Sequence, residues 1–184
     1  MIDRPAFDEF PGDAATLPPM AETGAIDKAE LRRQLVQALE HEHETVAAAQ
    51  RRTAEGVTHE DNRPEGDKDM RSTEASYVAR GQAMRVRALE EDLAKVVGMT
   101  LRGFDDDAPV ALSAIVELEG EGSRSTVFVA PAGGGTRLAL GGVTIQVVTP
   151  ASPLGKALVG ARAGDDVEVQ KGGATETLEI VSVR

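Results

Sequence analysis

Apolar positions in the first half of the chain repeat with a helical period. The stretch from residue 27 to residue 55 contains neither Pro nor Gly, and Asp27 followed by Glu30 is typical of a helix start. Within it, apolar and small side chains recur at steps of three, four or seven residues, at Leu35, Leu39, Val46, Ala49 and Thr53. A seam of two residues per heptad is narrower than the buried face of a globular helix and is typical of a coiled coil.

A second helix is predicted over residues 67–97. Its seam consists of Met70, Tyr77, Met84, Leu89, Leu93 and Val96. Pro64 and Gly66, which lie between the helices, end the first one and allow the chain to reverse. Two helices of about 30 residues then pair antiparallel over about 45 Å. We therefore expect an antiparallel coiled-coil helical hairpin over residues 26–98.

After Gly98 the apolar period changes from helical spacing to alternation. Residues 110–118 alternate as in a half-buried strand, and further short strands are predicted at 125–130, 143–148, 166–170 and 177–183. One helix interrupts them, with Ser152 as its cap, Pro153 at its first position and Gly160 at its end. Residues 99–184 therefore form a small α+β domain, an antiparallel sheet covered by one short helix.

Composition and charge narrow the functional classes. The chain carries a formal net charge of −11, which disfavours non-specific nucleic-acid binding. It has no Cys, which excludes disulfide and Cys-based zinc scaffolds, and no apolar run long enough for a membrane span. Residues 1–25 hold five acids, one base and four Pro, so we expect a flexible acidic tail. We expect the protein to lie in the cytoplasm.

The bend between the two helices is unusually acidic. Five acidic residues lie between positions 60 and 69, namely Glu60, Asp61, Glu65, Asp67 and Asp69. We call residues 59–69 the acidic tip, because the hairpin holds them at its far end. Like charges at a turn repel one another, which indicates a functional role, and a merely solvated loop is the alternative.

The C-terminal segment, residues 147–183, carries a distinctive order of short motifs. They are Ser152-Pro153-Leu154, Ala157-Leu158-Val159-Gly160, Gly164-Asp165-Asp166, Gly172-Gly173 and Glu179-Ile180-Val181. In this order and spacing they resemble the C-terminal domain of the Gre family, the bacterial transcript-cleavage and elongation factors. The resemblance implies an FKBP-like fold for residues 99–184 and, with the hairpin, extends over residues 26–184.

The resemblance also implies a mechanism. Such factors bind RNA polymerase and insert the hairpin into its secondary channel, where tip acids help to hold Mg²⁺ for hydrolysis of the backtracked RNA 3′ end. The implied metal contacts are Asp67 and Asp69, with Glu65 and Asp61 as supporting charge. The implied polymerase contacts are Ser152, Pro153, Leu154, Gly155, Lys156 and Ala157. The protein would then be an accessory factor and not itself an enzyme, a monomer that shares Mg²⁺ with the polymerase and binds none alone.

The tip departs from the family motif, which reads approximately Gly-Asp-Leu-x-Glu-Asn. Gly66 and Asp67 match it, whereas Lys68, Met70 and Arg71 replace the Leu, Glu and Asn. Two alternatives therefore stay open: a non-cleaving regulator or inhibitor in the same channel, and a coiled-coil adaptor that acts without polymerase. Prolyl isomerisation, which an FKBP-like fold suggests, is disfavoured because the C-terminal domain has only two aromatic residues for an apolar pocket.

Overall fold

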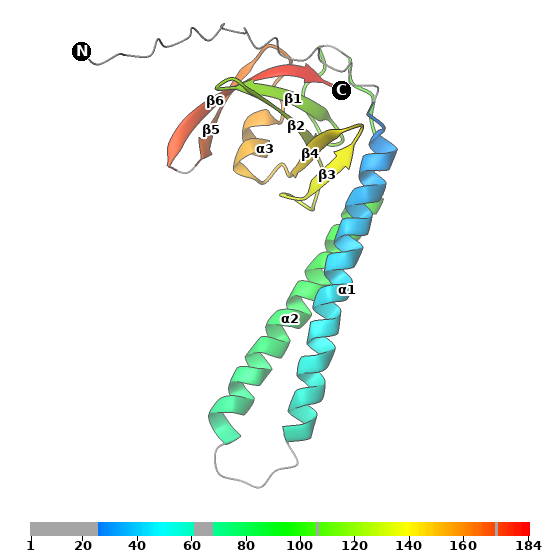
Figure 1. The fold of residues 1–184 in the computed structure, drawn as a ribbon, viewed down its shortest axis with the longest axis vertical. Coiled ribbons are helices and arrows are strands. Elements are labelled where there is room, and N and C mark those ends of the chain that lie inside the picture. Colours follow the sequence, from blue (N-terminus) through cyan, green and yellow to red (C-terminus); the bar gives the residue numbers. More distant parts are fainter. Residues whose placement is uncertain (1–25, 61–67, 106, 172) are drawn as a thin grey trace, which may run out of the picture.

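A computed structural model describes residues 26–60, 68–105, 107–171 and 173–184. Two long helices, α1 (Lys28–Glu60) and α2 (Lys68–Val97), lie side by side and project from a sheet domain (Figure 1). Both predicted long helices are confirmed. Asp27 begins the first, because its carboxylate accepts a hydrogen bond of 2.9 Å from the Ala29 backbone N–H. Neither helix is both long and apolar enough, within the described residues, to cross a membrane.

The seam of α1 lies where the spacing predicted, whereas the seam of α2 does so only in the part near the sheet. Leu35 and Leu39 are buried in the helix pair. Tyr77 and Met84 are 69% and 68% exposed, so their predicted place in the seam is wrong. Leu89, Leu93 and Val96 face inward as predicted, and the next inward positions toward the far end of the hairpin are Val86 and Gln82. At 100° per residue, Met84 is rotated by about 200° around the helix from Gln82 and, in the other direction, from Val86. It therefore lies on the opposite side of α2 and faces solvent.

Halfway along the hairpin the contact between the helices becomes polar. Glu42 of α1 forms an ion pair with Arg85 of α2. His43 Nε2 lies 3.5 Å from a carboxylate oxygen of Glu90 but forms no hydrogen bond in the described structure. The side-chain oxygen of Gln82 is buried and likewise accepts no hydrogen bond from the described residues. An unpaired buried polar atom costs free energy, so this layer weakens the pair.

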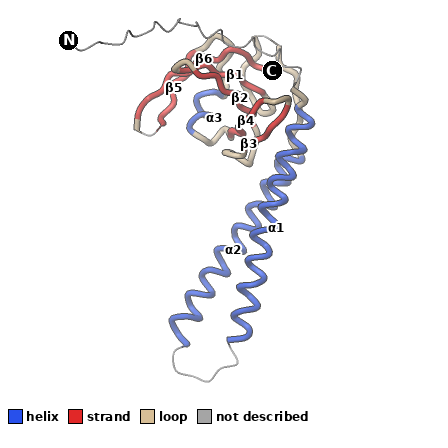
Figure 2. Tube along the Cα trace, in the orientation of Figure 1, coloured by secondary structure: helices blue, strands red, loops and turns tan. Residues whose placement is uncertain are grey.

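The second half of the chain forms one six-stranded sheet. Its strands are β1 (Ile115–Gly120), β2 (Ser123–Val129), β3 (Arg137–Leu140), β4 (Val143–Val148), β5 (Asp166–Lys171) and β6 (Ala174–Val183). They lie in the order β3-β4-β2-β1-β6-β5 (Figure 2). The prediction of a wholly antiparallel sheet is wrong, because β2 and β4 pair in parallel. After β2 the chain runs through the Gly-rich loop at 130–136 to β3 at the edge of the sheet. The turn after β3 then brings β4 back between β3 and β2.

Two strand predictions need correction for local reasons. The strand predicted over 110–118 begins only at Ile115. Ser113 has φ of 71° and is fully buried, and its hydroxyl accepts a 2.9 Å hydrogen bond from the Arg102 N–H. That left-handed residue ends any extended run before β1. The short strand β3 was not predicted, because four residues between two Gly-rich turns carry little alternation.

Both faces of the sheet are covered, whereas the sequence predicted only one covering helix. The short helix α3 (Pro153–Leu158) packs on one face, and the base of the hairpin covers the other. Neighbouring strand residues alternate between the two layers, as Ile115 and Val116 do. The hairpin-side core contains Leu31, Leu35, Leu39, Leu89, Val96, Met99, Ile115, Phe128, Ala130, Ala132, Leu138, Ile145 and Val147. The α3-side core includes Val116, Leu118, Val127, Val129, Val148, Leu158, Val167 and Ile180.

Polar contacts fix the base of the hairpin to the start of the sheet domain. The Lys28 ammonium donates a 2.6 Å hydrogen bond to the Arg102 carbonyl and lies 4.5 Å from the centre of the Phe104 ring. Burial lowers the pKa of this Lys28 amine. One turn further on, the Arg32 guanidinium donates to the Met99 carbonyl at 3.2 Å. These bonds tie α1 to the chain that leaves α2.

The helix α3 is held tightly against the turn that precedes it. A Cβ built on Gly155 would lie 1.9 Å from the Thr149 carbonyl oxygen and 2.7 Å from its carbon. Both atoms belong to the backbone and cannot move aside as a side chain would. Only Gly therefore allows α3 to sit this close to the end of β4.

Gln82→Leu should stabilise the hairpin. The change removes a buried amide oxygen without a partner and adds apolar area to the seam, so the free energy of unfolding should rise by about 1 kcal/mol. Thermal unfolding followed by circular dichroism at 222 nm measures it. Gln37→Leu, on the exposed face of α1, is the matched control and should change the stability by no more than about 0.5 kcal/mol. Equal gains in both variants would contradict the burial argument.

Gly155→Ala should destabilise the sheet domain. The new methyl group overlaps the Thr149 backbone, and the free energy of unfolding should fall by about 2–4 kcal/mol, measured by urea denaturation. Gly103→Ala is the control, since its added Cβ would meet no atom within 4 Å. A Gly155→Ala protein as stable as the wild type would show that α3 does not depend on this contact.

Candidate functional site

The site begins with the capped turn that opens α3. The Ser152 hydroxyl accepts a 3.1 Å hydrogen bond from the Gly155 N–H and donates one of 2.7 Å to the Thr149 carbonyl. Pro153 occupies the first helical position, where its missing N–H costs nothing. The predicted cap and first residue of this helix are confirmed. The sequence thus fixes the orientation of a helix of one and a half turns at the edge of a sheet face.

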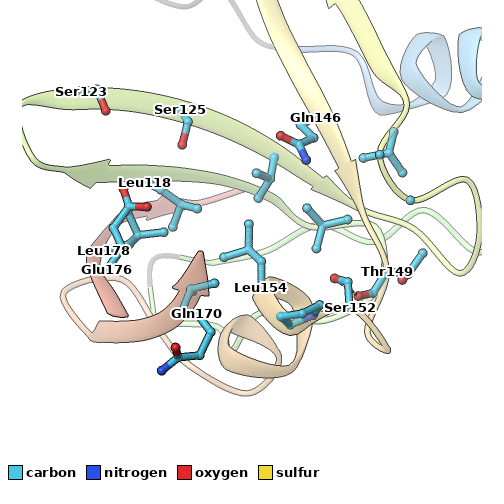
Figure 3. A pocket seen from close by; sticks show the side chains of 17 residues that line it. Leu118, Ser123, Ser125, Gln146, Thr149, Ser152, Leu154, Gln170, Glu176 and Leu178 are labelled. Carbon is cyan, nitrogen blue, oxygen red and sulfur yellow. Dashed lines mark hydrogen bonds between the residues drawn. The ribbon is translucent and has the colours of Figure 1, made fainter. Parts of the chain in front are cut away.

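A groove of about 580 Å³ runs between α3 and the face of the sheet (Figure 3). Its apolar part comes from Leu118, Val127, Val148, Leu154, Val169 and Leu178. Its polar part comes from Ser123, Ser125, Gln146, Thr149, Ser152, Gln170 and Glu176. These residues come from five strands, α3 and the turn before it, so the groove exists only in the folded domain. Such a mixture of apolar floor and hydrogen-bonding side chains suits a protein ligand.

The described lining of the groove carries little charge. Glu176 is the only charged residue among the described side chains that line it. No group of three or more His, Asp or Glu side chains within the described residues could hold a metal ion. The other lining residues are apolar or neutral and polar.

The six predicted polymerase contacts occupy different depths. Ser152, Pro153 and Leu154 line the groove, as the close-up in Figure 3 shows for Ser152 and Leu154. Lys156 is exposed, whereas Gly155 is buried and cannot reach a partner. Ala157 is half-buried and packs against the α3-side core. The role of all six in binding stays a prediction.

Most of the acidic tip falls on residues that the structure does not describe. Asp61, Glu65 and Asp67 lie outside the described residues, so their predicted role stays untested. Asp69 belongs to the first turn of α2, but its side chain is likewise outside the description. What the structure does give is the position of the two helix ends that flank the tip. Glu60 ends α1 and Lys68 begins α2, both at the end of the hairpin away from the sheet (Figure 1).

Sequence reasoning found the part of the groove that belongs to α3 and missed the strands. Ser125 and Gln146 lie on β2 and β4, which are paired in parallel, with Thr126 opposite Ile145 and Val127 opposite Gln146. The signal was present as polar residues at alternate positions of two apolar strands, Ser123 and Ser125 on one and Thr144 and Gln146 on the other. Their meeting depends on strand order, which the alternation does not specify.

Comparison with known proteins identifies the C-terminal segment. Residues 142–184, from the start of β4 to the end of the chain, match the family described as transcription elongation factor GreA/GreB, C-terminal domain. No curated protein matches the chain.

Several solved structures resemble the fold. The GreA factor homolog 1 (Gfh1) protein of Thermus thermophilus is 20% identical, with a TM-score of 0.35 over 81% of this chain and 94% of that one. A second structure, titled the transcription factor Gfh1, is 26% identical, with a TM-score of 0.36 over 83% of this chain and 92% of that one. The prokaryotic transcription elongation factor GreA/GreB from Nitrosomonas europaea is 19% identical, with a TM-score of 0.33 over 52% of this chain and 78% of that one. The segment 142–184 therefore matches the C-terminal domain of the Gre family of transcription elongation factors, as its order of motifs predicted.

Proposed function

We propose that this protein binds RNA polymerase through the groove beside α3 and places its helical hairpin in the secondary channel. There the tip carboxylates assist Mg²⁺-dependent cleavage of backtracked RNA. The observation that carries the proposal is the GreA/GreB match over residues 142–184, since that segment contains α3 and the strands on either side of it. In this role the protein supplies groups to the polymerase's own active site and is not an enzyme by itself.

The shape of the groove supports the docking part of the proposal. Pro153 is exposed at its edge, and Leu154 and Leu178 are half-buried, so a partner could cover apolar area that the fold leaves open. The serine and glutamine side chains around this floor can exchange hydrogen bonds with a partner backbone. The tight packing of Gly155 on Thr149 keeps α3 rigid, which reduces the entropy lost on binding.

The length of the hairpin supports the delivery part. α1 has 33 residues and α2 has 30, so the pair spans about 45–50 Å from the sheet to the tip. Mg²⁺ takes oxygen ligands and commonly binds only one or two protein carboxylates, with phosphates and water completing its shell. Asp67 and Asp69 would supply such carboxylates to a metal that the polymerase and the RNA hold in part. A second metal at a scissile phosphate stabilises the attacking and leaving oxygens.

A second function, occupation of the channel without cleavage, is favoured by the residues of the tip. Lys68, Met70 and Arg71 stand where the family motif has Leu, Glu and Asn. Loss of the Glu removes one metal-binding oxygen ligand, and two added basic side chains reduce the negative charge beside Asp67. A tip altered in this way could still obstruct the channel. The cleavage experiment below separates the two functions.

Asp67→Ala combined with Asp69→Ala should abolish RNA cleavage. In a backtracked elongation complex with purified polymerase, the wild-type protein should increase the rate of 3′-end cleavage, and the double variant should lower that increase by about 10²-fold or more, because the second metal loses its carboxylates. Asp105→Ala, an exposed acid of the sheet domain, is the control and should leave cleavage unchanged. No stimulation by the wild type, together with competition for the channel, would support the non-cleaving regulator.

Pro153→Asp should weaken binding to core polymerase by about tenfold or more. Pro153 is exposed at the edge of the groove, and a charge there would be desolvated by a partner, whereas an acid at the first position of a helix is compatible with folding. Val159→Asp, which places the same charge on a side chain 43% exposed just beyond α3, is the control and should bind normally. Binding measured by fluorescence anisotropy decides this, and equal affinities of the two variants would place the interface elsewhere.

A further inference from the structure

One side of α2 is more apolar than the fold of a single chain requires. Three of the six large apolar side chains that are exposed among the described residues lie there, with Tyr77 69%, Val78 54% and Met84 68% exposed. Counted from Gly81 at 100° per residue, these three lie at about −40°, +60° and −60° around the helix. Arg85 lies on the same side, at about +40°. We call these five residues the Gly81 face.

Gly81, at the centre of this face, has no packing role within the described part of the chain. A Cβ built on it would meet no atom within 4 Å, so neither α1 nor the sheet domain comes close to it. Glycine inside a helix is less favourable than alanine, because it loses more backbone freedom on folding. What glycine offers on a helix surface is close approach by another backbone. Its position between exposed apolar side chains therefore suits contact with a second helix.

A second copy of α2 fits this face when it runs antiparallel about a two-fold axis through Gly81. Such an axis sets the residue n positions before Gly81 opposite the residue n positions after it on the second copy. Val78 then faces the second copy's Met84, so that apolar surface covers apolar surface. Tyr77 faces the second copy's Arg85, which places a guanidinium against an aromatic ring. Arg85 can keep its ion pair with Glu42 of its own chain, and no like charges stand opposite each other in these pairs.

The rest of the hairpin leaves room for this packing. Leu89 and Val86, which face α1, lie about 80° and 140° from Gly81 around the helix, so α1 lies beside the contact and not within it. Lys68 lies 13 positions before Gly81 and Val97 lies 16 positions after it. The helices of one copy therefore end about 20 Å from the axis, short of the second sheet domain at about 24 Å (Figure 1). The two helix ends that flank the acidic tips are about 40 Å apart, beyond the range of strong charge repulsion at physiological salt.

We propose that this protein self-associates through the Gly81 face, as an antiparallel pair of hairpins with the two-fold axis at Gly81. The contact involves one side of one helix in each copy, which is small for a specific interface, so we expect a Kd of about 10–100 µM. At lower concentration the chain is the monomer that the family resemblance implied. The self-association does not rest on the proposed function. If that function holds, the pair covers one side of the hairpin and must separate before the hairpin enters the polymerase channel.

Sedimentation velocity of the full-length protein tests the association directly. Between about 1 and about 500 µM, the wild type should shift from monomer to dimer. Gly81→Glu sets two carboxylates against each other at the axis and should weaken the dimer by at least about tenfold. The space around Gly81 is open and Glu is the better helix former, so circular dichroism should show an intact hairpin. Gln37→Glu, which adds the same charge on the exposed face of α1, is the matched control and should dimerise as the wild type does.

Disulfide crosslinking tests the register, because the chain has no Cys of its own. The Val78→Cys and Met84→Cys proteins are oxidised separately and as a mixture. The axis sets position 78 opposite position 84 and holds two copies of the same position more than about 10 Å apart, too far for a disulfide. The mixture should therefore form intermolecular disulfides at least about tenfold faster than either protein alone.

Four results would overturn the proposal. A wild type that stays monomeric up to about 500 µM would exclude the association. A dimer that Gly81→Glu leaves intact would place the contact on another surface. Disulfides that form faster in the single variants than in the mixture would show a parallel pair. A monomeric wild type whose Gly81→Glu variant loses affinity for core polymerase would assign the Gly81 face to the polymerase.

Discussion

The architecture depends on one apolar layer that two different substructures share. Leu31 and Leu35 of α1 and Val96 at the end of α2 share one buried cluster with Phe128 and Ile145 of the sheet. The hairpin thus has no separate core at its base, and one face of the sheet is buried only because the hairpin covers it. Gly133, with φ of 76°, permits this closeness, since a Cβ there would lie 2.7 Å from a Leu35 methyl group. Because the two parts share a core, the direction of the hairpin is fixed by the strands beneath it.

The opposite face of the same sheet is what remains for a partner. Alternation along each strand sends Phe128 to the hairpin and its neighbours Val127 and Val129 to α3. α3 has only six residues and covers part of that face, and the uncovered part is the groove. The groove and the hairpin are therefore coupled through a single sheet layer. A partner held in the groove would meet the hairpin at a defined angle, which a flexible connection between two domains would not provide.

Periodicity predicted the elements well and their mutual arrangement less well. Leu35 and Leu39 were recognisable because both seam positions are apolar. In α2 the seam contains Gln82, and the seven-residue spacing of Tyr77 and Met84 suggested a seam on the wrong face. The strand before Ile115 was lost to the left-handed Ser113, a conformation that a serine rarely adopts and that no pattern indicates. In the groove, the α3 residues followed from capping rules. Ser125 and Gln146 required the order of strands, which depends on long-range pairing.

The hairpin is not equally stable along its length. Near the sheet its contacts are leucine and valine side chains that are fully buried, and hydrogen bonds to the Met99 and Arg102 carbonyls support them. Halfway out, the Glu42–Arg85 ion pair and a layer with two unpaired polar atoms replace them. Partly exposed ion pairs contribute little and weaken with salt, so the outer half opens at a lower free energy than the base. In the proposed function this gradient would be useful, because the base would keep the direction of the hairpin while the outer half adjusted to the channel.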